Sequence, residues 1–165
     1  KYPDKGIIMT ECCTGDTEVG LKITNDLAHA EKYAHDLLGN LNAGLNGYTD
    51  WNIALDQENG PYHNRSGHCA APIICDNEKD EILCQSSYYY IGHFSKFIRP
   101  EAERIGTSCY TDKLEVTSFL NQDGKLATVV LNRSDSDLPY TLRMDGQLLD
   151  RVIPAHSIET VVMAE

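Results

Sequence analysis

The stretch "KGIIMTECCTG", residues 5–15, sets the fold problem for this chain. An apolar run from Ile7 to Met9 leads directly to a carboxylate at Glu11, followed by two cysteines and a glycine. A short run that is apolar on both faces is typical of a buried strand in a parallel sheet. The sequence therefore predicts a fully buried strand that ends beside an acidic side chain, and the rest of the chain has to explain that glutamate.

A helix is predicted after this strand. Apolar residues recur every three or four positions, which is the period of one helix face; they are Val19, Ile23, Leu27, Ala30, Ala34 and Leu37. Asp16 or Thr17 is expected to cap the start of the helix, and Gly39 to end it. The segment 47–55 is predicted to be a second strand. A strand, a helix and a strand within about fifty residues indicate a βαβ unit.

The periodicity of the chain changes along its length. Residues 56–72 are polar and rich in turn formers, "IICD" and "EILC" suggest a short hairpin, and residues 86–98 read as a helix that Pro100 ends. Beyond about residue 104 the pattern alternates, with a hairpin around "NQDGK" and further short strands. We therefore expect an α/β segment over residues 1–99 and a β-sandwich over residues 100–165.

Composition excludes several classes of protein. The 165 residues carry a formal net charge of −11, which argues against nucleic acid as a partner. No run of eighteen apolar residues is present, so a membrane-spanning helix is not expected. The histidines show no spacing typical of metal ligands, and we expect no metal and no cofactor. The six cysteines form no repeated zinc pattern, and most are expected to be reduced, structural thiols.

Four motifs occur in one order and together resemble a known family. They are "IIMTECCTG" (7–15), "GYTDWNIALDQENGP" (47–61), "YYYIGHFSKFIRPEAERIG" (88–106) and "VVLNRSDSDLPYTLRMDG" (129–146). The chain resembles, over nearly its whole length, the C-terminal part of glycoside hydrolase family 30, in its glucosylceramidase (acid β-glucosidase) branch. The resemblance implies the last two βα units of a (β/α)8 TIM barrel, followed by a C-terminal β-sandwich.

The resemblance also implies a role for Glu11, which falls on the position of the catalytic nucleophile at the end of the seventh barrel strand. Active sites of such barrels lie at the C-terminal ends of the strands. A retaining glycosidase needs two carboxyl groups about 5 Å apart, one to attack the sugar and one to transfer the proton. The alternative for Glu11 is a carboxylate that stabilises the start of the following helix.

Further contacts to substrate are implied around the same cleft. Trp51 matches the tryptophan that lines the glucose pocket in the resembling family, and the alternative is a tryptophan of the core. Asn64, Arg65 and Ser66 are candidate substrate contacts, although the loop departs from the family pattern there. Asp50 and Asn52 are interpreted as supporting residues, because strand alternation points them away from the face of Trp51. Cys13 is expected to be a buried thiol without a catalytic role.

The acid/base residue of the family lies on the fourth barrel strand, which has no counterpart in these 165 residues. The sequence therefore predicts part of a retaining β-glycosidase that acts on glucosylceramide or related β-glucosides and that is inactive as an isolated chain. The alternative is a non-catalytic carbohydrate- or partner-binding β-sandwich module with a scaffold segment. Self-association through exposed strand edges is also expected, and the sequence does not indicate a compartment.

Overall fold

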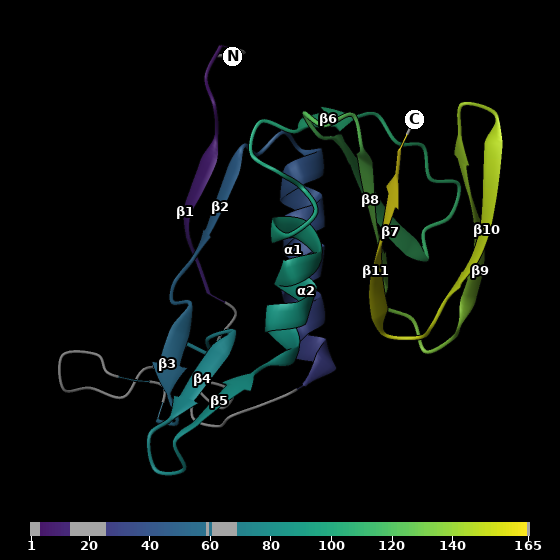
Figure 1. Ribbon diagram of the computed structural model, residues 1–165. Helices are drawn as coiled ribbons and strands as arrows, with labels where there is room; N and C mark the ends of the chain where they lie inside the picture. The colour runs from purple at the N-terminus through teal and green to yellow at the C-terminus, as the bar shows by residue number, and fades with distance from the viewer. Residues whose placement is uncertain (1–3, 14–25, 59, 61–68, 165) are drawn as a thin grey trace. The chain divides into compact units, whose positions relative to one another are not determined.

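The computed structural model describes residues 4–13, 26–58, 60 and 69–164 of the chain. The chain divides into two compact units, an α/β unit of Lys1–Ile91 and a β unit of Gly92–Glu165 (Figure 1). Each unit is described separately below.

The α/β unit begins with the predicted βαβ arrangement. Strand β1 (Ile8–Cys12) pairs in parallel with β2 (Gly47–Asp50), and helix α1 (Leu27–Asn42) lies between them in the sequence (Figure 1). The expectation of a fully buried first strand is wrong for this chain, because Ile8 is 62% exposed. Within the described residues β1 has only one neighbouring strand, so its apolar side chains are covered only in part.

Helix α1 has well-formed ends. Asp26 caps the start, where its carboxylate accepts a hydrogen bond from Ala28 N. The helix passes through Gly39, so the prediction that this glycine ends it is wrong. The helix ends instead at Asn42, and Gly44, two residues later, has a φ of +99°, the left-handed conformation that glycine adopts without strain. There Gly44 N donates to Leu41 O, and Leu45 N donates to Asn40 O, which is the Schellman arrangement.

The predicted second strand is divided in two. Strand β2 stops at Asp50, and β3 (Ala54–Asp56) belongs to a different sheet, in which it pairs in parallel with β4 (Ile73–Asp76). Strand β5 (Glu81–Cys84) completes the predicted hairpin with β4. Leu55, Ala71 and Ile74 form the buried cluster of this small sheet.

Helix α2 (Ser86–Ser95) follows the hairpin, as the sequence predicts. Tyr90 and Phe94 are buried on one side of it, whereas Tyr88 and Tyr89 are exposed. The run of three tyrosines therefore contributes one ring to the core, as expected for a helix that packs along one face.

The β unit consists of two sheets. Four strands pair in the order β11–β8–β7–β6, and a separate ribbon pairs β9 with β10 (Figure 1). The strands are β6 (Glu103–Ile105), β7 (Leu114–Leu120), β8 (Leu126–Asn132), β9 (Leu138–Met144), β10 (Gln147–Ile153) and β11 (Ser157–Met163). The core between the sheets contains Leu114, Val130 and Ile153. This arrangement is the predicted β-sandwich.

The sandwich is closed by tight turns and by the end of α2. Asp145 and Gly146 both have positive φ angles, as the two central residues of a type I′ hairpin require. His93 Nδ1 lies 2.9 Å from Thr160 Oγ1 of β11. Burial lowers the pKa of the His93 imidazole, which favours the neutral form in this contact.

No helix in the described parts of the chain is both long and apolar enough to cross a membrane.

Candidate active site

Glu11 and Trp51 lie at the carboxyl ends of two adjacent parallel strands. Glu11 is the fourth of the five residues of β1, and Trp51 directly follows the last residue of β2. The backbone joins them closely, because Trp51 N donates a hydrogen bond of 2.8 Å to Cys12 O. Both side chains are exposed, the indole by 42%. An acidic and an aromatic side chain therefore follow adjacent strands at the edge where parallel α/β sheets bind ligands.

The contacts of the neighbouring residues identify the face of the sheet that α1 covers. Cys12 and Asp50 are register partners across the two strands. The Cys12 thiol lies 3.7 Å from Asp36 Oδ2 of α1, and Tyr33 of the same helix donates to Asp50 Oδ1 over 3.0 Å. Cys12 and Asp50 therefore lie on the side of the two strands that α1 covers, whereas Glu11 and Trp51 are both exposed.

An irregularity in β1 adjoins the carboxylate. The register passes from Met9–Tyr48 to Cys12–Asp50, so three steps along β1 correspond to two steps along β2. Such a bulge changes the direction of the side chains beside it and is frequent next to active sites. Here the extra residue falls within the stretch that includes Glu11.

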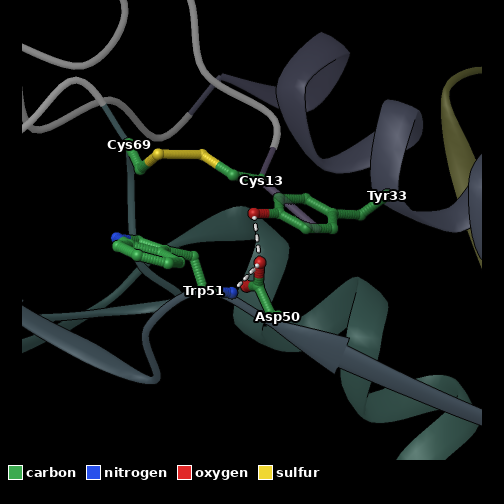
Figure 2. The surroundings of a disulfide bond; sticks show 5 residues. All are labelled: Cys13, Tyr33, Asp50, Trp51 and Cys69. Carbon is green, nitrogen blue, oxygen red and sulfur yellow. Dashed lines mark hydrogen bonds between the residues drawn. A yellow bond between two sulfur atoms is a disulfide. The ribbon is translucent and has the colours of Figure 1, made fainter. Parts of the chain in front are cut away.

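Asp50 is the central residue of the contacts on the helix side. Its Oδ1 accepts from the Tyr33 hydroxyl and, over 2.9 Å, from the backbone N–H of Trp51 (Figure 2). Burial raises the pKa of the Asp50 carboxyl, although both of these hydrogen bonds lower it. Its location between helix and sheet agrees with the interpretation of Asp50 as a supporting residue.

The Cys12 thiol lies in an environment that keeps it protonated. Burial raises its pKa, and the neighbouring Asp36 carboxylate raises it further. Burial also raises the pKa of the Tyr48 hydroxyl far above its usual range. Because the thiolate is the reactive form of cysteine, Cys12 is a poor nucleophile in spite of its location beside Glu11.

A disulfide bond joins Cys13 to Cys69, with a distance of 6.1 Å between the two Cα atoms (Figure 2). The expectation that Cys13 is a buried free thiol is therefore wrong. The other four cysteines are free, so most of the cysteines are reduced, as predicted. The partners are separated by 56 residues, and no spacing rule in a single sequence could have paired them. The bond ties the segment after Glu11 to the segment before β4.

Three of the predicted site residues cannot be located. Asn64, Arg65 and Ser66 lie outside the described residues, between Gly60 and Cys69. Among the residues that the structure describes, no group of three or more His, Cys, Asp or Glu side chains could hold a metal ion.

The sequence did not indicate that Tyr33 and Cys69 lie in contact with residues next to the candidate site. Tyr33 adjoins the apolar stripe of α1, and nothing in the pattern indicates that its hydroxyl bonds a residue of β2.

Comparison with known proteins identifies the family. The family model described as the glycosyl hydrolase family 30 TIM-barrel domain matches residues 1–98, and the family 30 β-sandwich domain matches residues 101–161. Mouse lysosomal acid glucosylceramidase is 35% identical over 163 residues, which cover 96% of this chain and 31% of the mouse protein.

Two solved structures are also similar. SrfJ from Salmonella typhimurium has a TM-score of 0.88 at 30% identity and an endo-β1,6-glucanase has 0.83 at 27%, each covering 99% of this chain. The alignments cover 36% and 37% of those two chains, so this chain spans about a third of the length of its relatives. The expected fold class, part of a TIM barrel followed by a β-sandwich, is confirmed. With both domain models matched in order along its length, the chain belongs to glycoside hydrolase family 30.

Proposed function

We propose that this chain carries the catalytic nucleophile, Glu11, of a retaining β-glycosidase. The observation that supports the proposal most directly is the location of Glu11 and Trp51, both exposed, at the carboxyl ends of the adjacent parallel strands β1 and β2. An exposed carboxylate beside an indole suits a sugar, because the apolar face of a pyranose packs on an aromatic ring while the carboxylate reaches the anomeric carbon.

The reaction would proceed in two displacements. The Glu11 carboxylate attacks the anomeric carbon, an ester bond to the sugar forms, and the bond to the leaving oxygen breaks as a second carboxyl group protonates that oxygen. Water, deprotonated by the same second group, then attacks the anomeric carbon and releases Glu11 as a carboxylate. Glu11 has to act as a carboxylate in the first step, and its side chain is exposed.

The second carboxyl group is proposed to lie outside these 165 residues. Asp50 adjoins the site but bonds Tyr33 on the helix side of the sheet, so it does not face the substrate position. We propose that the chain alone does not hydrolyse β-glucosides and that activity requires a polypeptide that also supplies the proton donor. Turnover of 4-nitrophenyl β-D-glucoside by the isolated chain, abolished by Glu11→Gln, would contradict this proposal.

The substrate class is proposed from the relatives. A glucosylceramidase and an endo-β1,6-glucanase are among the similar proteins, and both names describe enzymes that cleave β-glucosidic bonds. We propose a β-glucoside as substrate, with glucosylceramide as the first candidate because of the 35% identity to the mouse protein. The proposed division of labour assigns sugar binding and nucleophilic attack to residues 1–99 and structural support to the sandwich of residues 100–165.

The alternative, a carbohydrate-binding sandwich module, has less support. Binding modules present exposed aromatic rings on a sheet face. In the β unit Phe119 is buried and the hydroxyl of Tyr140 is bonded to Glu159, which leaves Tyr110, 98% exposed, as the one largely exposed ring in the described part of that unit beyond residue 100. Binding of residues 100–165 to a glycan array would support the alternative.

A covalent trap tests the role of Glu11. In a polypeptide that contains both carboxyl groups, a 2-deoxy-2-fluoro-β-glucoside with a good leaving group should accumulate as a glycosyl ester, because the fluorine slows hydrolysis of the ester. We expect peptide mass spectrometry to locate the sugar on Glu11. The Glu11→Gln variant should remain unlabelled and lose at least about 10³-fold in kcat.

The matched control for this experiment is Glu81→Gln, since Glu81 is exposed at the start of β5, in a different sheet from β1 and β2. It should leave both labelling and kcat unchanged. A sugar found on another carboxylate, with Glu11→Gln still labelled, would remove Glu11 from the mechanism.

A further inference from the structure

We infer that Tyr33 and Asp50 form a positioning pair that holds Trp51, and through its backbone the end of β1, in the geometry that the sugar site needs. The expected effect of this pair on catalysis depends on the proposed function. The pair itself rests on hydrogen bonds between α1 and the ends of β1 and β2.

The backbone N–H of Trp51 is the group on which these contacts converge. It lies 2.8 Å from Cys12 O, so one donor is shared between two acceptors. The second acceptor, Asp50 Oδ1, lies 2.9 Å away (Figure 2). Cys12 is the residue that directly follows Glu11, and it is the last residue of β1. A displacement of Trp51 would therefore also release the strand end that carries the proposed nucleophile.

Tyr33 gives this junction a rigid attachment. Its side chain, on helix α1, is fully buried. Its ring packs edge-on against the ring of His29, with 5.5 Å between the two ring centroids. A buried aromatic ring has few accessible rotamers, so its hydroxyl occupies a defined position. From there the hydroxyl donates to Asp50 Oδ1 over 3.0 Å. The oxygen that accepts from Trp51 N is thus itself held by the helix.

The hydrogen bonds of Asp50 and Tyr33 help to fix the position of the Trp51 indole, because much of the indole is exposed to solvent. Its side chain is 42% exposed, in contrast to the fully buried ring of Tyr33. Packing alone holds an exposed ring less firmly than a buried one, and a displacement of about 1 Å in a binding group can cost about 10²-fold in rate. We therefore assign Tyr33 and Asp50 the role of positioning residues, which do not themselves touch the substrate.

Four single variants separate positioning from general stability. Tyr33→Phe removes the hydroxyl and keeps the buried ring, and Asp50→Ala removes the shared acceptor. Asp50→Asn retains an acceptor oxygen for both donors and should rescue the geometry. The matched control is Tyr140→Phe in the β unit, which also removes a donor to a carboxylate, because Tyr140 donates to Glu159 Oε1 over 2.8 Å.

The first readout is the fluorescence of this chain. Trp51 is its only tryptophan, so emission reports on this one site. We expect Tyr33→Phe and Asp50→Ala to shift the emission maximum and to raise the acrylamide quenching constant at least about 1.5-fold, with an unchanged far-UV circular dichroism spectrum. Asp50→Asn and Tyr140→Phe should behave as the unmodified chain does. This readout needs no sugar and no activity.

The second readout is kinetic and uses a polypeptide that contains both carboxyl groups. For 4-nitrophenyl β-D-glucoside we expect Tyr33→Phe to lower kcat/KM about fivefold, mainly through KM, since one hydrogen bond that orders the sugar platform is lost. Asp50→Asn should stay within about twofold of the parent. Tyr140→Phe should leave KM unchanged even where it lowers the melting temperature.

The outcomes distinguish the two claims. Equal effects of Tyr33→Phe and Tyr140→Phe on emission and KM, or an Asp50→Asn variant as impaired as Asp50→Ala, would overturn the positioning role. A fluorescence change as expected, together with failure of Glu11 to be labelled by the fluorinated glucoside, would retain the positioning pair and overturn the glycosidase proposal.

Discussion

Asn132 shows how a side chain that reads as a surface feature in the sequence becomes a structural one in the fold. "NRS" at residues 132–134 has the form of an N-glycosylation sequon. In the structure the Asn132 side chain is fully buried, and its amide nitrogen lies within hydrogen-bond distance of the carbonyls of Ser136, Ile153 and Pro154. The atom that would carry a glycan is thus occupied and shielded from solvent.

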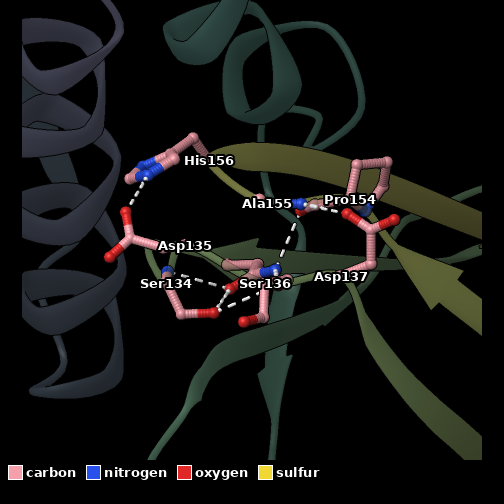
Figure 3. Close-up of polar contacts among 8 residues, drawn as sticks. Ser134, Asp135, Ser136, Asp137, Pro154, Ala155 and His156 are labelled. Atoms are coloured by element: carbon pink, nitrogen blue, oxygen red, sulfur yellow. Dashed lines mark hydrogen bonds and ion pairs between the residues drawn. The ribbon is translucent and has the colours of Figure 1, made fainter.

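The amide organises the two loops that meet at this end of the sandwich. Asn132 Oδ1 accepts from both the backbone N and the hydroxyl of Ser134. Figure 3 shows further contacts between the same two loops, in which Ala155 N donates to Asp137 over 2.9 Å and His156 Nε2 lies 2.8 Å from Asp135 Oδ1. The 133–137 loop and the β10–β11 turn are therefore joined through one buried side chain.

We predict that Asn132→Ala lowers the free energy of unfolding of the β unit by about 3 kcal/mol, because it leaves buried carbonyls without a donor. Urea denaturation followed by circular dichroism measures this change. Arg133→Ala is the control, since the exposed Arg133–Glu115 ion pair is expected to contribute less than about 1 kcal/mol. A glycan on Asn132 of the folded protein, or equal losses in the two variants, would contradict the prediction.

At the residue scale the sequence was informative where a side chain sits in a motif. Glu11 and Trp51 stand out because each follows a strand pattern and matches a family motif, and the structure brings the two together at adjacent strand ends. Their catalytic roles remain predictions. Tyr33 and Cys69 carry no such signal, since a hydroxyl or a thiol in a single sequence does not reveal its partner.

At the scale of elements, the Cys13–Cys69 bond is the main cross-link of the α/β unit. It joins the segment that follows β1 to the segment that precedes β4 across 56 residues. The loop entropy removed from the unfolded chain corresponds to about 4 kcal/mol for a loop of this length. A bond of this kind persists in oxidising compartments, so we expect the oxidised form in protein recovered from such a compartment.

We predict that Cys13→Ser lowers the free energy of unfolding of the α/β unit by about 2–4 kcal/mol. Denaturant titration under oxidising conditions tests this, with the loss of two hydrogens in intact mass spectrometry as evidence that the bond forms. Cys109→Ser provides the control, because Cys109 is a free and exposed cysteine of the β unit. Addition of a reductant should destabilise the parent chain and leave Cys13→Ser unaffected, and the opposite pattern would rule out the bond.

The elements themselves were mostly predictable, and the errors have local causes. The βαβ unit, the 73–84 hairpin, α2 and the sandwich strands follow from periodicity and turn residues. The prediction that α1 ends at Gly39 was wrong, because an isolated glycine is tolerated inside a helix. The Schellman hydrogen bonds that end the helix form at Gly44. The segment 47–55 divided because β2 and β3 belong to different sheets, which periodicity alone does not reveal.

At the scale of the whole molecule, the unpaired strand edges of the α/β unit favour self-association. Within the described residues β1 pairs only with β2, and Ile7 and Ile8 are 60% and 62% exposed. An exposed apolar edge offers unpaired backbone groups and a hydrophobic surface to a second copy. We propose that two copies associate through the β1–β2 sheet.

We predict that the isolated chain sediments as a dimer or larger species at micromolar concentration. Ile8→Lys should shift it toward the monomer, because a charged edge disfavours strand pairing. The matched control, Ile82→Lys on β5, replaces an isoleucine that is 73% exposed in the other sheet of the same unit and should leave the sedimentation coefficient unchanged. A monodisperse parent monomer would count against the proposal.

The amino-acid sequence by itself determined the order and type of the elements, the family and the identity of the candidate acid and aromatic residues, because periodicity, turn residues and linear motifs are local properties. The tertiary structure decided which distant groups meet: Tyr33 with Asp50, Cys13 with Cys69, and the Asn132 amide with the carbonyls of two loops. Such pairings depend on how the chain returns to itself in space, and the energies that select them arise from burial and hydrogen bonding across long sequence separations.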